Sequence, residues 1–221
     1  MFELNPYPKI ERSNFHGTSI FKIDNFYQNP DEVFDYLFNR EVPFWKIEEY
    51  PSRNRLYFED KRLQLKDRRL YGVSVFLSNL CKQKPYNFQA TTNMARYLYD
   101  DFNSYRDSYW WPHTDSGYNA LVYFNKGDGG NGTNLYLSCE DDEKQFTDST
   151  PEHYEPWRPK NKYVRAKYLK PRYNRMYMFD GEKFLHGPAI NNDRYFYKHF
   201  PGQNPNTFRC NQVFFFWPCP L

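Results

Sequence analysis

Short apolar stretches separated by turn-forming residues dominate the chain from about residue 90 onward. Clusters of Gly, Asn, Asp and Pro divide them, most plainly across 126–132. The predicted strands are Met94–Tyr99, Tyr109–Asp115, Asn119–Phe124, Thr133–Leu137, Val164–Leu169, Met176–Phe179 and Thr207–Trp217. Seven or more short strands favour a sandwich or a jelly roll, so we expect a mainly β fold.

The first 90 residues predict elements that support this β region. Asn29 is a candidate N-cap, Pro30 occupies the first helical position, and apolar residues then recur at helical spacing as far as Phe38. This pattern predicts a helix near residues 30–39. The apolar stretch 70–80 is compatible with either a helix or a strand, because short apolar runs are ambiguous. We expect a single domain over 1–221, with a supporting part over 1–90 and a core over 91–221.

Composition adds limits to this picture. The chain has 221 residues with 21 Tyr, 21 Phe and 5 Trp, so it can form a large core although its mean hydropathy is −0.97. No apolar run approaches the roughly 20 residues that span a bilayer, and the first 15 residues lack an apolar signal segment. Four cysteines without a CxxC spacing fit free thiols in a reducing compartment. We therefore expect a soluble, cytoplasmic protein without a membrane partner.

The charge balance bears on the partners of the protein. A net charge of +3 and a pI near 8.5 fall short of the strongly basic balance that marks nucleic-acid binders, so nucleic acid is not the expected partner. The acidic run 140–143 is interpreted as a solvated loop. No GxSxG, GxxxxGK[ST] or dinucleotide fingerprint occurs, which sets those enzyme classes aside.

The sequence that carries chemistry is Trp111-Pro-His-Thr-Asp115. If this stretch is a strand, positions i and i+2 point the same way, so His113 and Asp115 present an imidazole and a carboxylate to one side of a sheet. The best third ligand is His186, which follows an apolar strand and a Gly turn. Two histidines and one carboxylate on one face are typical of non-haem Fe(II) oxygenases, in which the opposite positions stay open.

Other interpretations compete with this one. The HxD spacing alone often occurs by chance, and a histidine in a strand is more often a packing or surface residue than a ligand. His153 and His199 have no partner at ligand spacing, so they are expected to be a surface and a packing histidine. Of Trp110 and Trp111, which flank the motif, at most one is expected to line a pocket.

A set of further matches in the same order gives the chain a family resemblance. The matching segments are Ala95-Arg-Tyr97, Pro112-His-Thr-Asp115, Leu121-Val-Tyr-Phe-Asn125, Gly129-Gly130 before Thr133-Asn-Leu-Tyr136, Phe179-Asp-Gly181 before His186, and Phe208-Arg209. Together they resemble the 2-oxoglutarate/Fe(II) oxygenases of the prolyl-hydroxylase-like branch. The resemblance covers roughly residues 90–217.

The resemblance implies a fold and a set of site residues. The fold is a double-stranded β-helix, a cupin-like jelly roll whose mouth holds Fe(II) through His113, Asp115 and His186. Arg209 matches the basic residue that meets the distal carboxylate of 2-oxoglutarate, Tyr123 matches a tyrosine that adds a hydroxyl to it, and Tyr97 matches one lining the same pocket. An arginine suits this role, because its planar fork pairs bidentately with a carboxylate.

Two points of this assignment depart from the family pattern or stay open. The gap between His186 and Arg209 is longer than usual, so Arg194 and Lys198 are alternatives to Arg209 for the cosubstrate carboxylate. Arg209 is preferred because it opens the last strand. The segment 190–207 is then an inserted loop that covers the mouth of the site.

These expectations lead to one predicted activity and two competing ones. The resemblance implies a dioxygenase that uses Fe(II), 2-oxoglutarate and O₂, with ascorbate as a candidate additional reductant, to hydroxylate a peptide residue or a small molecule with release of succinate and CO₂. In related halogenases the carboxylate ligand is absent, so Asp115 favours hydroxylation. The alternatives are a cupin-like enzyme with another divalent metal and a jelly-roll binding module without catalysis. The substrate and the oligomeric state are not encoded in any pattern.

Overall fold

The computed structural model describes residues 1–38, 45–50, 53–59, 63–64, 68–82, 84–99, 102–127, 132–138, 157–190, 193–198 and 208–219. Within these residues, strands outnumber helices and pair almost entirely antiparallel. The expectation of a mainly β protein is therefore confirmed.

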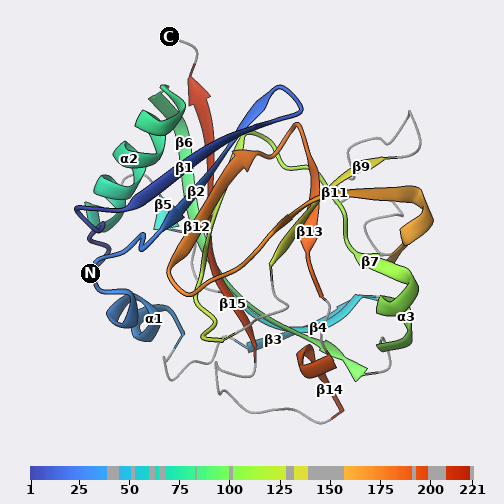
Figure 1. Cartoon of the computed structure of the whole chain (residues 1–221). Helices are drawn as coiled ribbons and strands as arrows, with labels where there is room; N and C mark the ends of the chain where they lie inside the picture. The colour runs from blue at the N-terminus through green and yellow to red at the C-terminus, as the bar shows by residue number, and fades with distance from the viewer. Residues whose placement is uncertain are drawn as a thin grey trace.

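One large sheet, called the major sheet, runs through the centre of the molecule (Figure 1). Its described strands pair in the order β1-β2-β12-β8-β15-β6-β4-β3, and β5 and β14 pair with β6. The strands are β1 (Lys9–Phe15), β2 (Thr18–Asp24), β3 (Trp45–Tyr50), β4 (Arg53–Glu59), β5 (Leu63–Gln64), β6 (Lys84–Leu98), β8 (Tyr118–Tyr123), β12 (Arg175–Asp180), β14 (Phe196–Tyr197) and β15 (Arg209–Cys219). The long strands β6 and β15 pair along most of their length and form the central pair of the major sheet.

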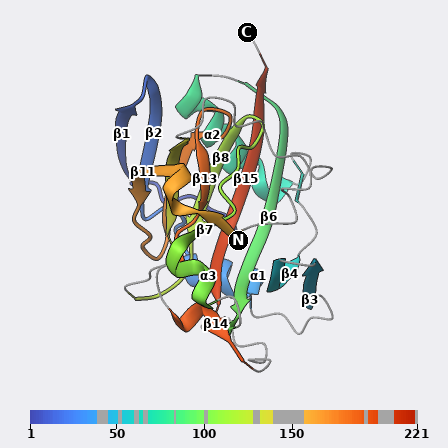
Figure 2. The same ribbon diagram turned by 90° about the vertical axis from the view of Figure 1, so that its right-hand side faces the viewer.

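A smaller sheet, called the minor sheet, faces one side of the major sheet (Figure 1). It consists of β11 (Tyr163–Leu169), β9 (Thr133–Ser138) and β13 (Leu185–Pro188), in that order. A two-stranded ribbon of β7 (Ser108–Trp110) and β10 (Trp157–Pro159) lies next to β13, as Figure 2 shows. From β6 to β15 the chain thus passes back and forth between the two layers.

Helices cover the other side of the major sheet. These are α1 (Pro30–Phe38) and α2 (Tyr71–Cys81), the latter preceded by the 3₁₀ turn η1 (Arg68–Leu70) (Figure 1). The remaining helical elements are α3 (Phe102–Asp107), η4 (Lys160–Lys162) and η5 (Asp193–Tyr195). Each helix in the described part of the chain is too short or too polar to cross a bilayer.

Side-chain alternation along the strands builds two separate apolar cores. In β8, Ala120 and Val122 pack toward the helices, whereas Leu121 and Tyr123 pack between the two sheets. In β15, Phe214 belongs to the helix-side core and Val213 to the core between the sheets. Because neighbouring strand residues face opposite sides, one strand serves both cores at once. The inner strands β8 and β15 are therefore buried on both faces.

Several sequence predictions are confirmed at the level of elements. The helix near 30–39 is α1, and the ambiguous stretch 70–80 is the helix α2. The strands predicted at 119–124, 133–137, 164–169 and 176–179 correspond to β8, β9, β11 and β12. The strand expected at 94–99 is the end of the much longer β6, and the strand expected at 207–217 begins at Arg209.

One strand prediction is wrong. The strand expected over 109–115 ends at Trp110, because Trp111 adopts a left-handed backbone conformation with φ of 41° that no strand can continue. The N-terminal region also contributes more than supporting elements, since its strands extend the major sheet at both edges. The acidic run 140–143 lies outside the described residues.

An ion pair fastens the N-terminal hairpin β1–β2 to the rest of the major sheet. Arg175, at the start of β12, donates from Nε to Asp24 Oδ1 at 2.5 Å and from Nη2 to Asp24 Oδ2 at 3.0 Å. Burial raises the pKa of Asp24, but the hydrogen bonds and charge of Arg175 outweigh it and hold that pKa below its ordinary value of 3.8. Both side chains are only 12% exposed, so this pair is shielded from solvent.

We expect Asp24→Asn to lower the free energy of unfolding by about 1–2 kcal/mol at pH 7, because it removes a charge-assisted bidentate contact. A carboxyl whose folded pKa is lowered stabilises the fold above its unfolded pKa, and this contribution is lost as pH falls through the folded pKa. The difference between the two proteins in urea titrations should be constant above about pH 5 and shrink below pH 4. Glu11→Gln, at an exposed pair with Lys22, should change little.

Candidate metal centre

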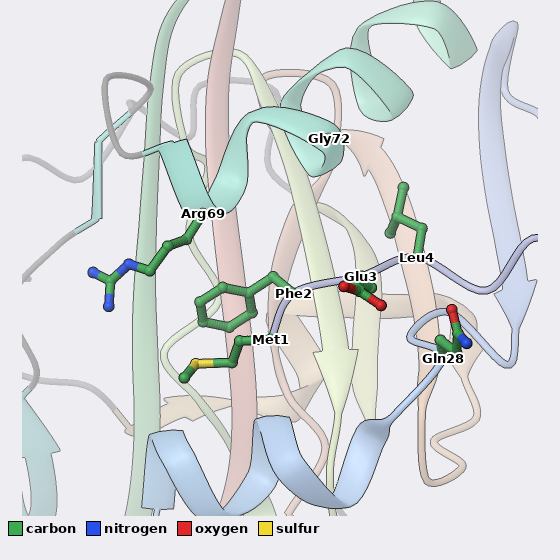
Figure 3. Close-up of a pocket in the computed structure, with 7 residues that line it drawn as sticks. All are labelled: Met1, Phe2, Glu3, Leu4, Gln28, Arg69 and Gly72. Carbon is green, nitrogen blue, oxygen red and sulfur yellow. The ribbon is translucent and has the colours of Figure 1, made fainter.

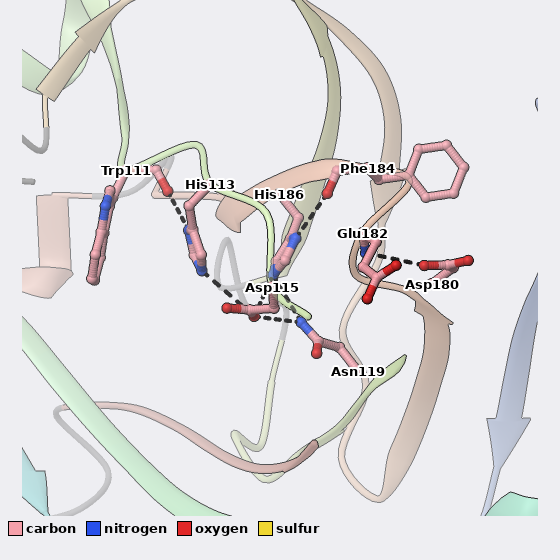
Figure 4. A network of polar contacts seen from close by, with 8 residues as sticks. All are labelled: Trp111, His113, Asp115, Asn119, Asp180, Glu182, Phe184 and His186. Carbon is pink, nitrogen blue, oxygen red and sulfur yellow. Dashed lines mark hydrogen bonds and ion pairs between the residues drawn. The ribbon is translucent and has the colours of Figure 1, made fainter. Parts of the chain in front are cut away.

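The loop between β7 and β8 meets strand β13 and brings His113, Asp115 and His186 together (Figure 4). His113 and His186 form an isolated antiparallel bridge, in which His113 N donates to His186 O at 3.0 Å and His186 N donates to His113 O at 2.7 Å. Asp115 N donates to Gly181 O at 3.1 Å, and Gly181 N donates to Gly117 O at 2.7 Å. Backbone hydrogen bonds thus fix all three positions.

The side chains of these residues converge. Asp115 Oδ2 lies 3.1 Å from His186 Nε2 and 3.7 Å from His113 Nε2, and one potential ligand atom from each residue lies within 4.8 Å of the others. His186 is 5% exposed, whereas the side chains of His113 and Asp115 are 22% and 27% exposed. The cluster is therefore closed on the protein side and open to solvent on the other.

Hydrogen bonds at the second ring nitrogens define which atoms face the cluster. His113 Nδ1 lies 2.7 Å from Trp111 O, and His186 Nδ1 lies 3.0 Å from Phe184 O. Carbonyl oxygens only accept, so each Nδ1 must carry the hydrogen and donate it. Both Nε2 atoms then turn their lone pairs toward the carboxylate of Asp115, and a cation between them, a proton or a metal ion, would stabilise this arrangement.

The carboxyl group of Asp115 is held in its charged form. Burial raises its pKa, but the charges that His113 and His186 carry when protonated, the hydrogen bond to His186 and a hydrogen bond from Asn119 together bring the pKa of Asp115 far below its ordinary value of 3.8. An ionised carboxylate and two imidazoles in the correct tautomer are the donor set of a divalent transition metal. The residues present therefore fit a resident metal ion such as Fe(II).

The sequence analysis reached these three residues through a strand argument that is partly wrong. His113 and Asp115 do not lie in a continuous strand, because β7 ends before them and Pro112 follows the left-handed Trp111. The side chains nevertheless meet, since the bridge to His186 and the hydrogen bond to Gly181 O replace the strand ladder. The triad is thus assembled by long-range contacts rather than by local alternation.

Asn119 is a member of this cluster that the sequence analysis missed. Its Nδ2 donates to Asp115 Oδ2 at 2.6 Å and lies 2.9 Å from His186 Nε2 (Figure 4). Its Oδ1 is buried without a hydrogen-bond partner among the described residues. The signal was its parity with Leu121 and Tyr123 in β8, which places Asn119 in the row that faces the minor sheet.

Arg209 opens the last strand, β15, and its side chain reaches the chain just before β9. It is 4% exposed, and it donates from Nη1 to Asn211 Oδ1 at 3.1 Å and from Nη2 to Gly132 O at 3.2 Å. Tyr123 is also buried, and its hydroxyl lies 2.7 Å from Thr133 Oγ1. Burial raises the pKa of Tyr123, and the nearby charge of Arg209 opposes that rise. Arg209 and Tyr123 therefore share one buried polar region.

Tyr97 belongs to an aromatic cluster beside the metal centre. Its ring centroid lies 4.6 Å from that of Trp110, 5.9 Å from Phe196 and 6.2 Å from Trp157. Trp110 belongs to this core, and Trp111 packs against the same core while its ring centroid lies 4.9 Å from that of His113. The expectation that one tryptophan packs in the core while only the other can line a pocket is therefore too simple, because Trp110 both packs in the core and lines a cavity.

The two alternatives to Arg209 point elsewhere. Arg194 is exposed and donates from Nη2 to the Tyr195 hydroxyl at 2.6 Å, and the Lys198 ammonium lies 4.3 Å from the ring centroid of Tyr99. Of the predicted loop 190–207, residues 193–198 form η5 and β14, and β14 pairs with the end of β6. His153 and His199 lie outside the described residues.

A separate hollow of about 470 Å³ lies on the helix side of the major sheet (Figure 3). It is lined by the N-terminal residues from Met1 to Leu4 and by Gln28, Arg69 and Gly72. None of the three metal-centre residues lines it, so it is not part of the candidate site.

Comparison with known proteins gives limited information. No family model and no curated protein matches the chain. Among solved structures, the chain is similar to the crystal structure of a Pseudomonas putida prolyl-4-hydroxylase, with 10% sequence identity, a TM-score of 0.39, and coverage of 80% of this chain and 78% of that chain. A likeness of this size carries no argument, so the functional conclusion depends on the site itself.

We expect the full chain to bind a divalent transition metal at His113, Asp115 and His186. Because a ligand that binds only the folded state stabilises it, Mn²⁺ at about 100 times its Kd should add about 2.7 kcal/mol and raise the Tm by roughly 5–10 °C. His113→Ala should abolish this shift. His16→Gln, in the turn between β1 and β2, is the control and should keep it. An equal shift in all three proteins would contradict the site.

Gly187 lets the two histidine-bearing segments approach each other. A Cβ at this position would lie 2.6 Å from Trp110 O and 3.0 Å from Trp111 O. Gly187→Ala should therefore push β13 away from the loop of His113, cost about 1–3 kcal/mol of stability and weaken metal binding at least tenfold in calorimetry. Gly72→Ala in α2 is the control: its Cβ meets nothing within 4 Å, so it should preserve metal affinity and slightly raise stability.

Proposed function

We propose that this chain is an Fe(II)- and 2-oxoglutarate-dependent dioxygenase that hydroxylates a peptide residue or a small molecule. The observation that carries the proposal is the convergence of two imidazole nitrogens and one ionised carboxylate, open to solvent on one side. Three ligands on one face suit an ion that must also bind a chelating cosubstrate and O₂. A closed structural site would have a fourth protein ligand instead.

The order of strands supports the fold that this function needs. From β6 to β15 the chain crosses repeatedly between the sheets: β6, β8, β12, β14 and β15 lie in the major sheet, whereas β9, β11, β13 and the β7–β10 ribbon lie in or beside the minor sheet, with β9, β10 and β11 following one another on that side. This crossing agrees with the double-stranded β-helix that the resemblance implies, within one catalytic domain. In such a jelly roll the space between the sheets is available for a cosubstrate.

Each residue of the centre has a role in holding the proposed groups. His113 Nε2, His186 Nε2 and the Asp115 carboxylate would hold Fe(II), and the carbonyls of Trp111 and Phe184 keep both rings oriented. Asn119 donates to Asp115 Oδ2, which leaves the other carboxylate oxygen available. When bound, Fe(II) with 2-oxoglutarate and O₂ supplies the oxidising chemistry and releases succinate and CO₂.

Arg209 is the proposed partner of the far carboxylate of 2-oxoglutarate. It is buried in the wall between the sheets and is oriented by neutral groups, the Asn211 amide and the Gly132 carbonyl. A bidentate guanidinium–carboxylate pair in a water-poor space gives both affinity and orientation. Tyr123 would add its hydroxyl to the same carboxylate, and Tyr97 would line the pocket through its contact with Trp110.

An anaerobic titration tests the proposal directly. Addition of Fe(II) and then 2-oxoglutarate to the full chain should produce a metal-to-ligand charge-transfer band, and admission of O₂ should yield succinate even without substrate. His113→Ala should lose both signals. Metal binding without the band would instead favour a cupin-like enzyme with another divalent metal, and the absence of both would favour a binding module.

The choice of cosubstrate anchor is tested by a matched pair of arginine variants. Arg209→Gln should weaken 2-oxoglutarate binding by about 100-fold, because a charge-assisted bidentate contact of roughly 3 kcal/mol is lost. Arg194→Gln removes an exposed guanidinium and should leave the affinity within twofold. The measurement is the concentration of 2-oxoglutarate that half-saturates the charge-transfer band. The reverse result would move the anchor to Arg194.

A further inference from the structure

A cavity of about 330 Å³ lies where β7 and its partner β10 separate from β13. The bridge between His113 and His186 joins the chain after β7 to β13. The cavity is lined by Trp110 and Trp157 from the β7–β10 ribbon and by Pro188 from β13. Asn134 in β9 also lines it. Its volume lies at the lower end of the range for small-molecule sites, which suits a ligand about as large as one amino acid residue.

Residues that line the cavity are close in sequence to the two histidines of the metal centre. Trp110 precedes His113 by three residues, and Pro188 follows His186 by two residues. The Trp110 and Trp111 carbonyl oxygens contact the position of Gly187, between His186 and Pro188. A molecule held here would therefore lie beside the two segments that present the histidines.

Three buried polar atoms of residues that line the cavity have no hydrogen-bond partner among the described residues. They are Asn134 Oδ1, Trp110 Nε1 and Trp157 Nε1. The Asn134 side chain is fixed by its other end, since Nδ2 donates to the Tyr136 hydroxyl at 3.0 Å. Because buried polar groups in native proteins nearly always have a partner in protein, water or ligand, these three atoms, one acceptor and two donors, give the residues around the cavity unused hydrogen-bonding capacity.

The charge at the cavity has one sign. Lys160 and Arg165 are lining residues, and the described residues that line the cavity include no Asp or Glu. Lys160 is held in place by donating to Arg106 O and by the ring of Tyr109, whose centroid lies 5.5 Å from its ammonium. Arg165 is exposed in β11. Two cations without a lining acid favour an anion.

We infer that this cavity binds a carboxylate attached to an amide-bearing, residue-sized body, as in an acidic amino acid derivative or an acidic residue of a peptide. The aromatic walls Tyr109, Trp110 and Trp157 accept the body, Asn134 and the indole nitrogens meet its amide, and Arg165 and Lys160 meet its carboxylate. The binding itself is independent of the proposed function. That the bound group is the part of the substrate next to the reacting position is a further claim, and it rests on the proposed function.

Calorimetry on the full chain without metal tests the binding. The probes are acetyl-glutamate amide and its neutral match acetyl-glutamine amide, and the same pair within the tripeptides acetyl-Gly-Glu-Gly-amide and acetyl-Gly-Gln-Gly-amide. The acidic probe should bind at least tenfold more tightly than its neutral match. Binding of the single residue alone identifies a small-molecule source, and binding of the tripeptide as well identifies a peptide source; either supports the site.

Variants separate this site from general charge attraction and from the metal centre. Arg165→Gln should remove the preference for the acidic probe. Lys167→Gln is the matched control, because the Lys167 ammonium lies over the ring of Phe15, 4.9 Å from its centroid, and does not line the cavity. His113→Ala should bind the probe like the native chain, so loss of iron chemistry and loss of this site give different results. No binding, equal affinity for both probes, or an equal effect of Lys167→Gln would overturn the inference.

Discussion

The bridge between His113 and His186 is the contact on which the candidate site depends. Two residues directly opposite in an antiparallel pair exchange both backbone hydrogen bonds and project their side chains to the same side. The two imidazole rings consequently lie 4.5 Å apart. Asp115 joins them only because the loop of Gly181 holds its backbone at the same end of the sheets. Neither β7 nor β13 could form this arrangement alone.

The site also shows how a fold holds an electrostatically unfavourable arrangement. The Nε2 lone pairs of His113 and His186 face the carboxylate of Asp115. Apolar side chains of the same volume would carry no such electrostatic repulsion. The opposing stabilisation comes from groups that are satisfied elsewhere: the Nδ1 hydrogens on backbone carbonyls, and the Phe179 ring packed edge-on at 5.1 Å from the His186 ring. The contacts at Nδ1 and at the Phe179 ring thus hold the imidazoles in place, while the Nε2 atoms and the Asp115 carboxylate remain able to bind a cation.

The sequence predicted where the inner strands lie but not which strands pair with one another. Alternation assigns the residues of β8 and β12 to one of two faces, and both faces are buried, because each strand has other strands beside it and a core on either side. Supporting strands were expected before residue 90, but the positions of β1 and β2 were not, since β1 pairs only with β2 and β2 is placed by pairing with β12, far along the chain. Asn119 was missed for a similar reason. Its parity places it on the face toward the minor sheet, but its contact with His186 depends on a segment far along the chain.

The parity of β15 connects the core to the proposed chemistry. β15 lies between β8 and β6, so its two faces are both inside the protein, and residues of one parity, Phe214 and Phe216, fill the helix-side core. Arg209 and Asn211 have the other parity, which they share with Val213. Burying an arginine and an amide there lowers stability relative to apolar residues of the same size, as is general for buried polar groups. The proposed cosubstrate site thus places its charge where the parity of β15 turns polar side chains toward Tyr123 and Thr133.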